Sequence, residues 1–248
     1  LWETVCAAAE SREEWELVIE YLKRSDSSFA GEKIMKIHLQ KLGDADTYLK
    51  LRRNKLETGH DYFDLVMFYH ERGEIEKAVA TAEEGAEKGR GRIVENIKYS
   101  RAYYQDQNDR EKTLHYATKE FKEELSFSAY QEVLTACPEE LRKEKKEELI
   151  KELKESGYYG RIHTLAEIYH HEGEYALLLE LIQKEDLHPG DYEELLSREF
   201  PREMLKYYKR RVDEYIGNQN RTSYREAAYL SLKIRDLYTR LDLVHQWD

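Results

Sequence analysis

Two similar stretches punctuate this chain and indicate its architecture: YHERGEI at residues 69–75 and YHHEGEY at residues 169–175. Weaker copies are YQDQND at residues 104–109 and LQKLGDA at residues 39–45. Each places Gly or Asn four residues after an apolar residue, and an acidic residue comes next. This order is typical of a helix C-terminus, a left-handed cap and the acidic first turn of the next helix. The stretches therefore predict helix–turn–helix junctions at Gly43, Gly73, Asn108 and Gly173.

Three further turns complete a regular spacing along the chain. Ser11 is a suitable N-cap for a following helix, and Pro138 and Pro201 are each followed within two residues by an acidic residue that suits the first turn of a helix. The junctions then recur about every 32 residues, a spacing typical of stacked helix pairs. A helix pair buries its apolar stripe only when it stacks on neighbouring pairs. The sequence therefore predicts an all-α fold, a right-handed α-solenoid of about seven antiparallel helix pairs, which forms one helical-repeat domain over residues 1–248.

The composition agrees with a helical chain and excludes several classes of protein. The 248 residues include 3 Pro and 12 Gly, whereas 37% are Asp, Glu, Lys or Arg, so helix breakers are few. The two cysteines, Cys6 and Cys137, exclude a disulfide framework and a Cys-based zinc site. No apolar run reaches the ~18 residues of a membrane span and no signal peptide is visible, so we expect a cytoplasmic protein with no membrane partner. The net charge of −11 disfavours nucleic acid as a partner of the whole surface.

The repeated stretches resemble the tetratricopeptide repeat. With Gly73 at the inter-helix turn, the positions at which that family places its packing residues hold Leu65, Tyr69, Ala78 and Ala82, and in the second stretch Leu165, Ala166, Tyr169 and Gly173. Ser100 and Arg101 depart from this pattern in the unit that contains Asn108. The resemblance implies a concave groove that binds a peptide or a protein. We expect that groove to be lined by Phe63, Met67, His70, His163, Glu167, His170 and His171.

The histidines near residue 170 admit three interpretations. The spacings place His163, Glu167 and either His170 or His171 along one helix face. Imidazoles and a carboxylate are ligands of zinc or iron, but one helix rarely completes a metal site and no second helix offers matching ligands. Contacts to a peptide and plain solvent exposure are the two alternatives. We therefore expect no metal and no other cofactor.

Tyrosine is over-represented, with 20 copies against 6 of Phe. Tyr69, Tyr104 and Tyr169 share one repeat position, so we expect them to pack in the core, where their hydroxyls need partners. Tyr also offers a large, rigid contact area to a binding partner. Five others are candidates for the lining of a groove: Tyr62, Tyr99, Tyr103, Tyr130 and Tyr192.

Basic residues cluster between residues 198 and 211. Arg202, Lys206 and Lys209 share one helix face, with Arg210 beside them. They form either the solvated side of an amphipathic helix or a local contact for phosphate or an acidic partner. A smaller basic patch with the same two interpretations is formed by Arg52, Arg53 and Lys55.

The C-terminal segment carries a second resemblance. Its packing residues include Tyr207, Tyr208, Tyr224, Leu237 and Trp247. They are similar to the C-terminal helical region of prokaryotic proteins that carry a SWIM zinc finger nearer their N-terminus. The Cys-x-Cys and Cys-x-His pairs of that finger do not occur here. The chain begins and ends inside apparent helices, so we expect a fragment of a longer protein whose missing part carries the zinc.

Catalysis finds little support in the sequence. It contains no Gly-rich phosphate loop after a strand, no Walker motif and no nucleophile elbow. Glu57-x-x-His60 and Glu167-x-x-His170 are typical of half of a di-iron site, which also needs inward-facing Glu residues on two further helices. We therefore expect a non-catalytic scaffold that binds a protein or peptide partner. The alternative is a nucleic-acid-associated accessory domain that uses the basic helix.

Overall fold

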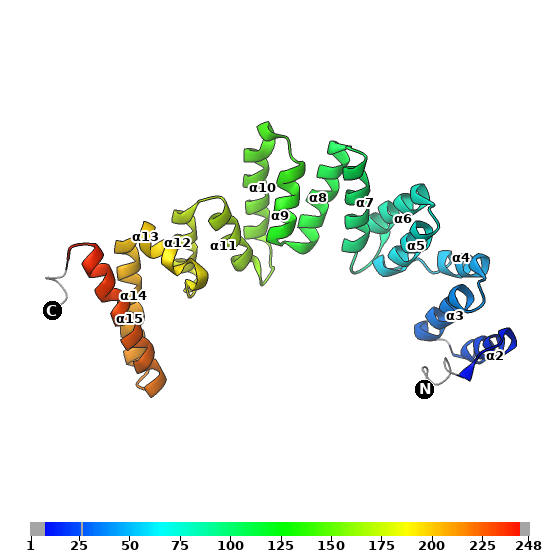
Figure 1. Ribbon diagram of the computed structural model, residues 1–248, viewed down its shortest axis with the longest axis horizontal. Coiled ribbons are helices and arrows are strands. Elements are labelled where there is room, and N and C mark those ends of the chain that lie inside the picture. The colour runs from blue at the N-terminus through cyan, green and yellow to red at the C-terminus, as the bar shows by residue number, and fades with distance from the viewer. Residues whose placement is uncertain (1–7, 26, 244–248) are drawn as a thin grey trace. The chain divides into compact units, whose positions relative to one another are not determined.

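The computed structural model describes residues 8–25 and 27–243. Over these residues the chain forms fourteen α-helices and two short 3₁₀-helices, and the only β-pairing is an isolated bridge between Thr58 and Arg90 (Figure 1). The all-α class predicted from the sequence is therefore confirmed. The helices expected at residues 1–3 and 247–248 lie outside the described residues, as does Cys6.

The chain divides into two compact units, and each is described by itself. Unit 1 comprises residues 1–124 and 128–145, and unit 2 comprises residues 125–127 and 146–248. Unit 1 contains α2 (Arg12–Leu22), α3 (Ser28–Gln40), α4 (Ala45–Arg53), α5 (Gly59–Glu71), α6 (Ile75–Lys88), α7 (Val94–Asp106), α8 (Arg110–Glu124), nearly all of α9 (Phe127–Ala136) and η1 (Glu139–Leu141). Unit 2 contains most of α10 (Arg142–Glu155), then α11 (Arg161–His171), α12 (Tyr175–Lys184), η2 (Gly190–Tyr192), α13 (Glu193–Glu199), α14 (Pro201–Gly217) and α15 (Arg221–Arg240). The single repeat domain over residues 1–248 stays a prediction.

All four predicted junctions adopt the left-handed backbone conformation. The φ angles are 64° at Gly43, 71° at Gly73, 56° at Asn108 and 74° at Gly173. The last three junctions share a capping hydrogen bond from the acidic residue after the turn to the carbonyl of the repeated tyrosine, at 3.0, 2.9 and 2.8 Å. This bond satisfies a carbonyl that the helix end would otherwise leave without a partner. The caps predicted from the sequence are therefore confirmed.

The other predicted turns hold with one adjustment. Ser11 caps α2, where its hydroxyl accepts the Glu14 amide and the Glu14 carboxylate accepts the Ser11 amide in return. Pro201 is the first residue of α14. Pro138 differs because it precedes the 3₁₀-helix η1, and α10 begins only at Arg142. The extended backbone of Pro138, with ψ at 143°, accounts for this extra turn.

In unit 1 the helices α5, α6 and α7 pack against one another. Leu65, Val66 and Tyr69 of α5 meet Ala78 and Ala82 of α6 in one buried cluster. The small residues of α6 let the helices approach closely. Gly85 is the extreme case, because a Cβ there would lie 2.5 Å from the Cβ of Tyr62.

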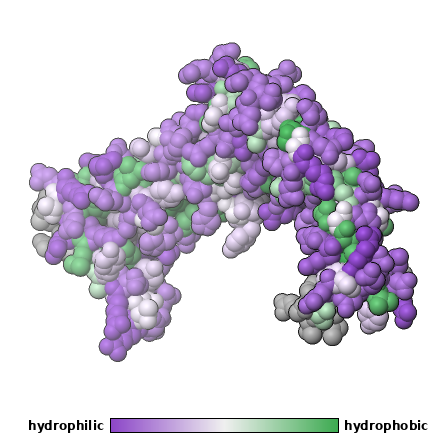
Figure 2. Space-filling model, turned by 45° about the vertical axis from the view of Figure 1, so that its right-hand side comes forward, coloured by the Kyte–Doolittle hydropathy of each residue, from purple (hydrophilic) through white to green (hydrophobic). Residues whose placement is uncertain are grey.

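Unit 2 has its own buried residues, and its longest helices form a hairpin. Leu149 and Leu153 of α10 are fully buried. The helices α14 and α15 are joined by a short loop and pack along their length, with Tyr208 and Ile234 among the buried residues. Figure 2 shows that hydrophilic side chains cover most of the face in view, with hydrophobic patches between them. Among the described helices, none is both long and apolar enough to cross a membrane.

Candidate functional site

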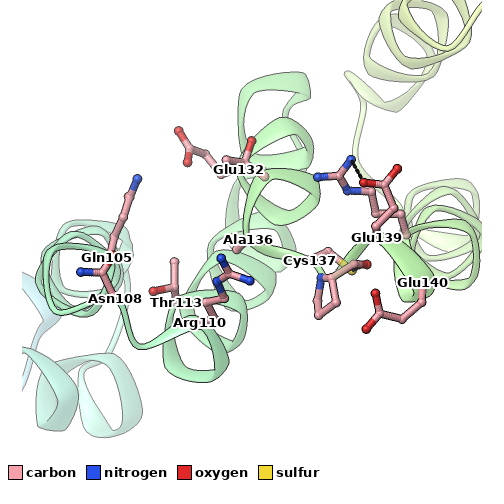
Figure 3. Close-up of a pocket in the computed structure, with 12 residues that line it drawn as sticks. Gln105, Asn108, Arg110, Thr113, Glu132, Ala136, Cys137, Glu139 and Glu140 are labelled. Carbon is pink, nitrogen blue, oxygen red and sulfur yellow. Dashed lines mark hydrogen bonds and ion pairs between the residues drawn. The ribbon is translucent and has the colours of Figure 1, made fainter.

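A cavity of about 590 Å³ in unit 1 lies between the α7–α8 turn and the α9–η1 turn. In Figure 3, Gln105 and Asn108 stand on one side, Cys137 and Glu139 stand on the other, and Arg110 lies between them. This volume falls within the range of ordinary ligand pockets. The full lining is Gln105, Asn108, Arg110, Thr113, Glu132, Thr135, Ala136, Cys137, Pro138, Glu139, Glu140 and Arg142.

Local sequence fixes both walls of this cavity. On one wall, Asn108 turns the chain into α8, and the Asp109 side chain caps that helix by accepting the Lys112 amide at 3.1 Å. The Thr113 hydroxyl donates to the Asp109 carbonyl at 2.7 Å and holds the same turn. On the other wall, α9 ends at Ala136 and extended Pro138 leads into η1. Both turns were predicted from the sequence, but their proximity was not.

Charged groups tie the helices around the cavity together. Arg101 of α7 donates through Nε to Glu120 Oε2 of α8 at 2.7 Å, and through Nη1 to Glu132 Oε2 of α9 at 2.8 Å. Glu120 is buried, so its negative charge requires such a partner. Arg101 therefore joins α7, α8 and α9. Glu132 also lines the cavity, so its bond to Arg101 holds one acidic group of the cavity in place.

The cavity contains acidic, basic and amide side chains. Positive charge comes from Arg110 and Arg142. Glu139 Oε2 lies 3.7 Å from Arg142 Nη1. Gln105 and Asn108 contribute amides, each of which both donates and accepts hydrogen bonds. Such a lining suits a ligand with donors, acceptors and charges of both signs.

The predicted groove residues of α5 lie in unit 1, and one of them, His70, contacts α7. Phe63 is half-buried, Met67 is partly exposed and His70 is exposed. His70 Nδ1 lies 2.8 Å from Tyr99 Oη, with the two rings edge to face at 5.6 Å between centroids. Tyr99 was predicted as a lining residue, and the structure brings it to His70.

The predicted groove residues of α11 lie in unit 2. His163, Glu167 and His170 are exposed on one side of α11, while Leu165 and Ile168 are buried on the other. The His170 ring lies 5.1 Å from the Tyr192 ring. Burial first, and then the nearby negative charge of Glu167, raises the pKa of Tyr192. The ring contact therefore places Tyr192 beside His170.

His171 does not share this surface. Its ring packs edge to face against Phe127 at 5.3 Å, and its Nδ1 lies 3.5 Å from Glu172 Oε1. Of the two histidines left open by the spacing, His170 therefore joins the face of His163 and Glu167. Within the described residues, no three His, Cys, Asp or Glu side chains gather as a metal site requires. Whether any residue of this set binds a partner stays a prediction.

The repeated tyrosines pack in the core, as predicted. Tyr69, Tyr104 and Tyr169 are all buried. Tyr69 Oη accepts a hydrogen bond from Arg53 Nη2 at 2.5 Å, and Tyr104 Oη donates to Glu83 Oε1 at 2.7 Å. The prediction that Tyr62 and Tyr130 line a groove is wrong, because both are buried. The side chain of Tyr103 is half-buried and contacts Tyr104.

The hydrogen bonds of two buried tyrosines to Glu83 predict a loss of stability at alkaline pH. The tyrosines are Tyr104 and Tyr116. The two rings stack, and both hydroxyls donate to Glu83 Oε1. Burial raises the pKa of Tyr116, and the Glu83 hydrogen bond and charge raise it further. Because the tyrosine pKa is higher in the folded state, the protonated hydroxyl contributes stability. This contribution is fully present below the ordinary pKa of about 10, and it is lost as the pH rises above that value. We expect helicity measured by circular dichroism to fall above about pH 10, and Tyr116→Phe to reduce the pH dependence of unfolding there. An unchanged pH dependence in Tyr116→Phe would contradict this assignment.

The predicted basic residues of α14 differ in their surroundings. Arg202 and Lys206 are exposed, and no ion pair of either is found within residues 8–25 and 27–243. Lys209 lies 5.0 Å above the Tyr238 ring. Arg210 pairs with Asp186 at 2.8 Å, so its charge is partly neutralised. This pairing weakens the case for a phosphate contact by the whole cluster.

The expected basic patch at Arg52, Arg53 and Lys55 is wrong for its first member. Arg52 is buried and bonds three carboxylates, Glu32 and Asp64 through Nη2 at 2.8 and 2.7 Å and Asp61 through Nη1 at 2.8 Å. These partners come from α3 and α5, whereas Arg52 belongs to α4. The guanidinium therefore joins three helices and is not available to a partner. A buried arginine requires such pairing because an unpaired charge in the interior is strongly unfavourable.

The comparisons with known proteins add no relative. No protein-family model matches this chain, and no curated protein matches it. The resemblances to tetratricopeptide repeats and to SWIM zinc finger proteins therefore stay proposals.

Proposed function

We propose that this chain is a non-catalytic scaffold that binds a peptide segment of a partner protein, and that the cavity of unit 1 holds the peptide. The observation that carries the proposal is the cavity itself, with its mixture of charged, amide and apolar side chains. A peptide presents backbone donors and acceptors together with charged side chains. Gln105 and Asn108 suit the backbone, whereas Arg110 and Glu140 suit the charges.

The exposed surface of α5 and α7 extends this site. Gln105 follows Tyr104 just as His70 follows Tyr69, so the two residues occupy equivalent positions in adjacent helices. Tyr99 lies six residues before Gln105, which is a rise of about 9 Å along the helix and a rotation of about 120° around it. A peptide that reaches both residues therefore crosses α7 obliquely, over at least about three extended residues. We therefore propose a path from the cavity along α7 to Met67, His70 and Tyr99.

The larger architecture belongs to the same proposal. The shared caps and the buried repeat tyrosines support helix pairs stacked as a right-handed solenoid of about seven units. In such an array, His163, Glu167 and His170 of α11 would offer a second contact surface of the same kind. The residue pattern after Tyr207 supports the proposal that the scaffold is the C-terminal part of a SWIM zinc finger protein.

A peptide selected from a random phage-displayed library tests the cavity. We expect the selected peptide, labelled with fluorescein, to bind the wild-type chain and to bind Thr135→Trp at least about tenfold more weakly, a loss of about 1.4 kcal/mol. The physical reason is that Thr135 is exposed and lines the cavity, so an indole there fills the space without entering the core. Fluorescence anisotropy measures both affinities.

Gln131→Trp is the matched control. Gln131 is exposed one turn earlier on α9 and does not line the cavity. We expect less than a twofold change in affinity for this variant, which adds the same indole outside the site. Equal affinity of wild type and Thr135→Trp would contradict the proposal, and so would a library that yields no binding peptide.

A further inference from the structure

The outward side of α15 combines exposed apolar residues with arginines. Leu232 is 51% exposed and lies opposite the buried side of this 20-residue helix. Tyr224 and Ala228 precede it at four-residue intervals and are also exposed, so an apolar stripe runs along the solvent side. Arg221 and Arg225 border the stripe, and neither makes an ion pair with any described residue. We name these five residues the basic face of α15.

The surrounding hairpin has the same sign of charge. Residues 201–240 hold ten Lys and Arg against five Asp and Glu, in a chain whose net charge is −11. Glu226 and Asp236 are the acidic residues of α15 itself. The hairpin is therefore a positive region of an acidic protein. Its natural partner is a negative surface with exposed apolar residues.

The helix α2 of unit 1 has such a surface. Leu17 is 66% exposed and Tyr21 is 68% exposed, although Trp15 and Ile19 on the other side of the helix are buried. Glu13 and Glu20 border this pair, and neither makes an ion pair with any described residue. Residues 10–21 hold five Glu against one Arg. We name Glu13, Leu17, Glu20 and Tyr21 the acidic face of α2.

We infer that copies of this chain associate head to tail, with the acidic face of α2 on one copy packed against the basic face of α15 on the next. Leu17 and Tyr21 pack against Tyr224 and Leu232, which removes these exposed apolar side chains from water. The glutamates face the arginines at the rim. Like faces repel one another, so pairing of α2 with α2, or of α15 with α15, is disfavoured. The contact is heterologous, because two different surfaces meet.

The size of the two faces sets the expected affinity. The 11 residues of α2 span about 16 Å. A contact between two helices of this length buries less than the roughly 1,200 Å² of a standard complex, so the association is weak. We expect a dissociation constant on the order of 10 to 100 µM at low salt, weakened roughly tenfold in about 0.5 M salt because the rim charges are screened. Neither face includes a residue of the cavity, so the inference stands apart from the proposed peptide site.

Sedimentation equilibrium of the full chain with two charge-reversal variants tests the inference. Glu13→Arg/Glu20→Arg makes both faces basic, and Arg221→Glu/Arg225→Glu makes both faces acidic. We expect wild type to show concentration-dependent association up to about 300 µM in low salt, and each variant alone to be monomeric. An equimolar mixture of the two variants is expected to associate as the wild type does, because each now meets a face of opposite charge.

The mixture distinguishes this contact from the other interpretations. Circular dichroism must show that both variants keep wild-type helicity and melting, which the exposure of all four replaced residues favours. A monomeric wild type at low salt, a variant that associates alone, or a mixture that stays monomeric would each overturn the inference. If the wild type is monomeric and binds a 20-base-pair DNA duplex, and Arg221→Glu/Arg225→Glu does not bind that duplex, the basic face would be assigned to nucleic acid instead.

Discussion

Replacing Arg52 with Met is expected to destabilise unit 1 by about 3 kcal/mol, because breaking a buried ion pair leaves unpaired charge in the interior. The Met side chain keeps the apolar stem of Arg52 but removes the guanidinium that Glu32, Asp61 and Asp64 share. These carboxylates then repel one another where α3, α4 and α5 meet. Hydrogen exchange with mass spectrometry measures the loss as faster exchange in α3–α5, while unit 2 serves as an internal reference.

Lys50→Met is the matched control for this prediction. Lys50 lies on the same helix and is exposed, so the same chemical change there should alter stability by less than about 0.5 kcal/mol. Equal exchange rates in α3–α5 for the two variants would contradict the structural role of Arg52.

The ion pairs of Arg52 also predict that the stability of unit 1 falls at acidic pH. Burial opposes ionisation of Asp61, but hydrogen bonds from Thr58 and Glu57 and the Arg52 charge hold the pKa of Asp61 below its ordinary value. Because the pKa of Asp61 is lower in the folded state, its carboxylate contributes stability at pH values above the ordinary pKa. This contribution is lost as the pH falls through the folded-state pKa. Arg52→Met removes part of this effect, so its stability should fall less steeply with acid.

Gly85→Ala is expected to destabilise unit 1 by about 2 kcal/mol, since overpacking exceeds the gain in helix propensity. The added Cβ would lie 2.5 Å from the Cβ of Tyr62 and 2.9 Å from the side chain of Asn96. Neither neighbour moves easily. Asn96 is fully buried and its Nδ2 donates to the Gly59 carbonyl at 2.7 Å, which holds it in place. Thermal unfolding and hydrogen exchange in α5–α7 measure the effect.

Gly31→Ala supplies the opposite expectation. Gly31 also lies within a helix, but its added Cβ would meet only the flexible end of Lys55, at 3.2 Å. We expect a gain of about 0.5 to 1 kcal/mol from helix propensity. If Gly85→Ala were as stable as Gly31→Ala, the close approach of α5, α6 and α7 would be wrong.

The helical framework was predictable because its signals are local. A left-handed cap favours Gly or Asn, and Gly73 and Asn108 stand where the chain turns. Turns without that signal were missed. Leu125, Asp186 and Gln219 also adopt positive φ angles, of 48°, 50° and 50°, although none of them is Gly or Asn.

The cavity and the Arg52 cluster were not predictable because their residues meet only through tertiary packing. Arg52 stands beside Arg53, so locally it resembles a basic surface. Its partners Glu32 and Asp64 are 20 and 12 residues away, and no periodicity relates them. The amphipathic pattern did identify the exposed sides of α5 and α11. It could not show that His70 contacts Tyr99, or that His171 packs against Phe127 instead of joining the surface of His163 and Glu167.

The central claim is tested most directly by NMR, as the changes in the amide chemical shifts of the isotope-labelled chain when the selected peptide is added. A peptide held in the cavity of unit 1 should perturb residues 105–113 and 131–142 most strongly, with smaller changes near Tyr99 and His70. The footprint should be absent in Thr135→Trp at the same peptide concentration. Perturbations confined to α11 or to α14 and α15, or a footprint that Thr135→Trp leaves unchanged, would contradict the account.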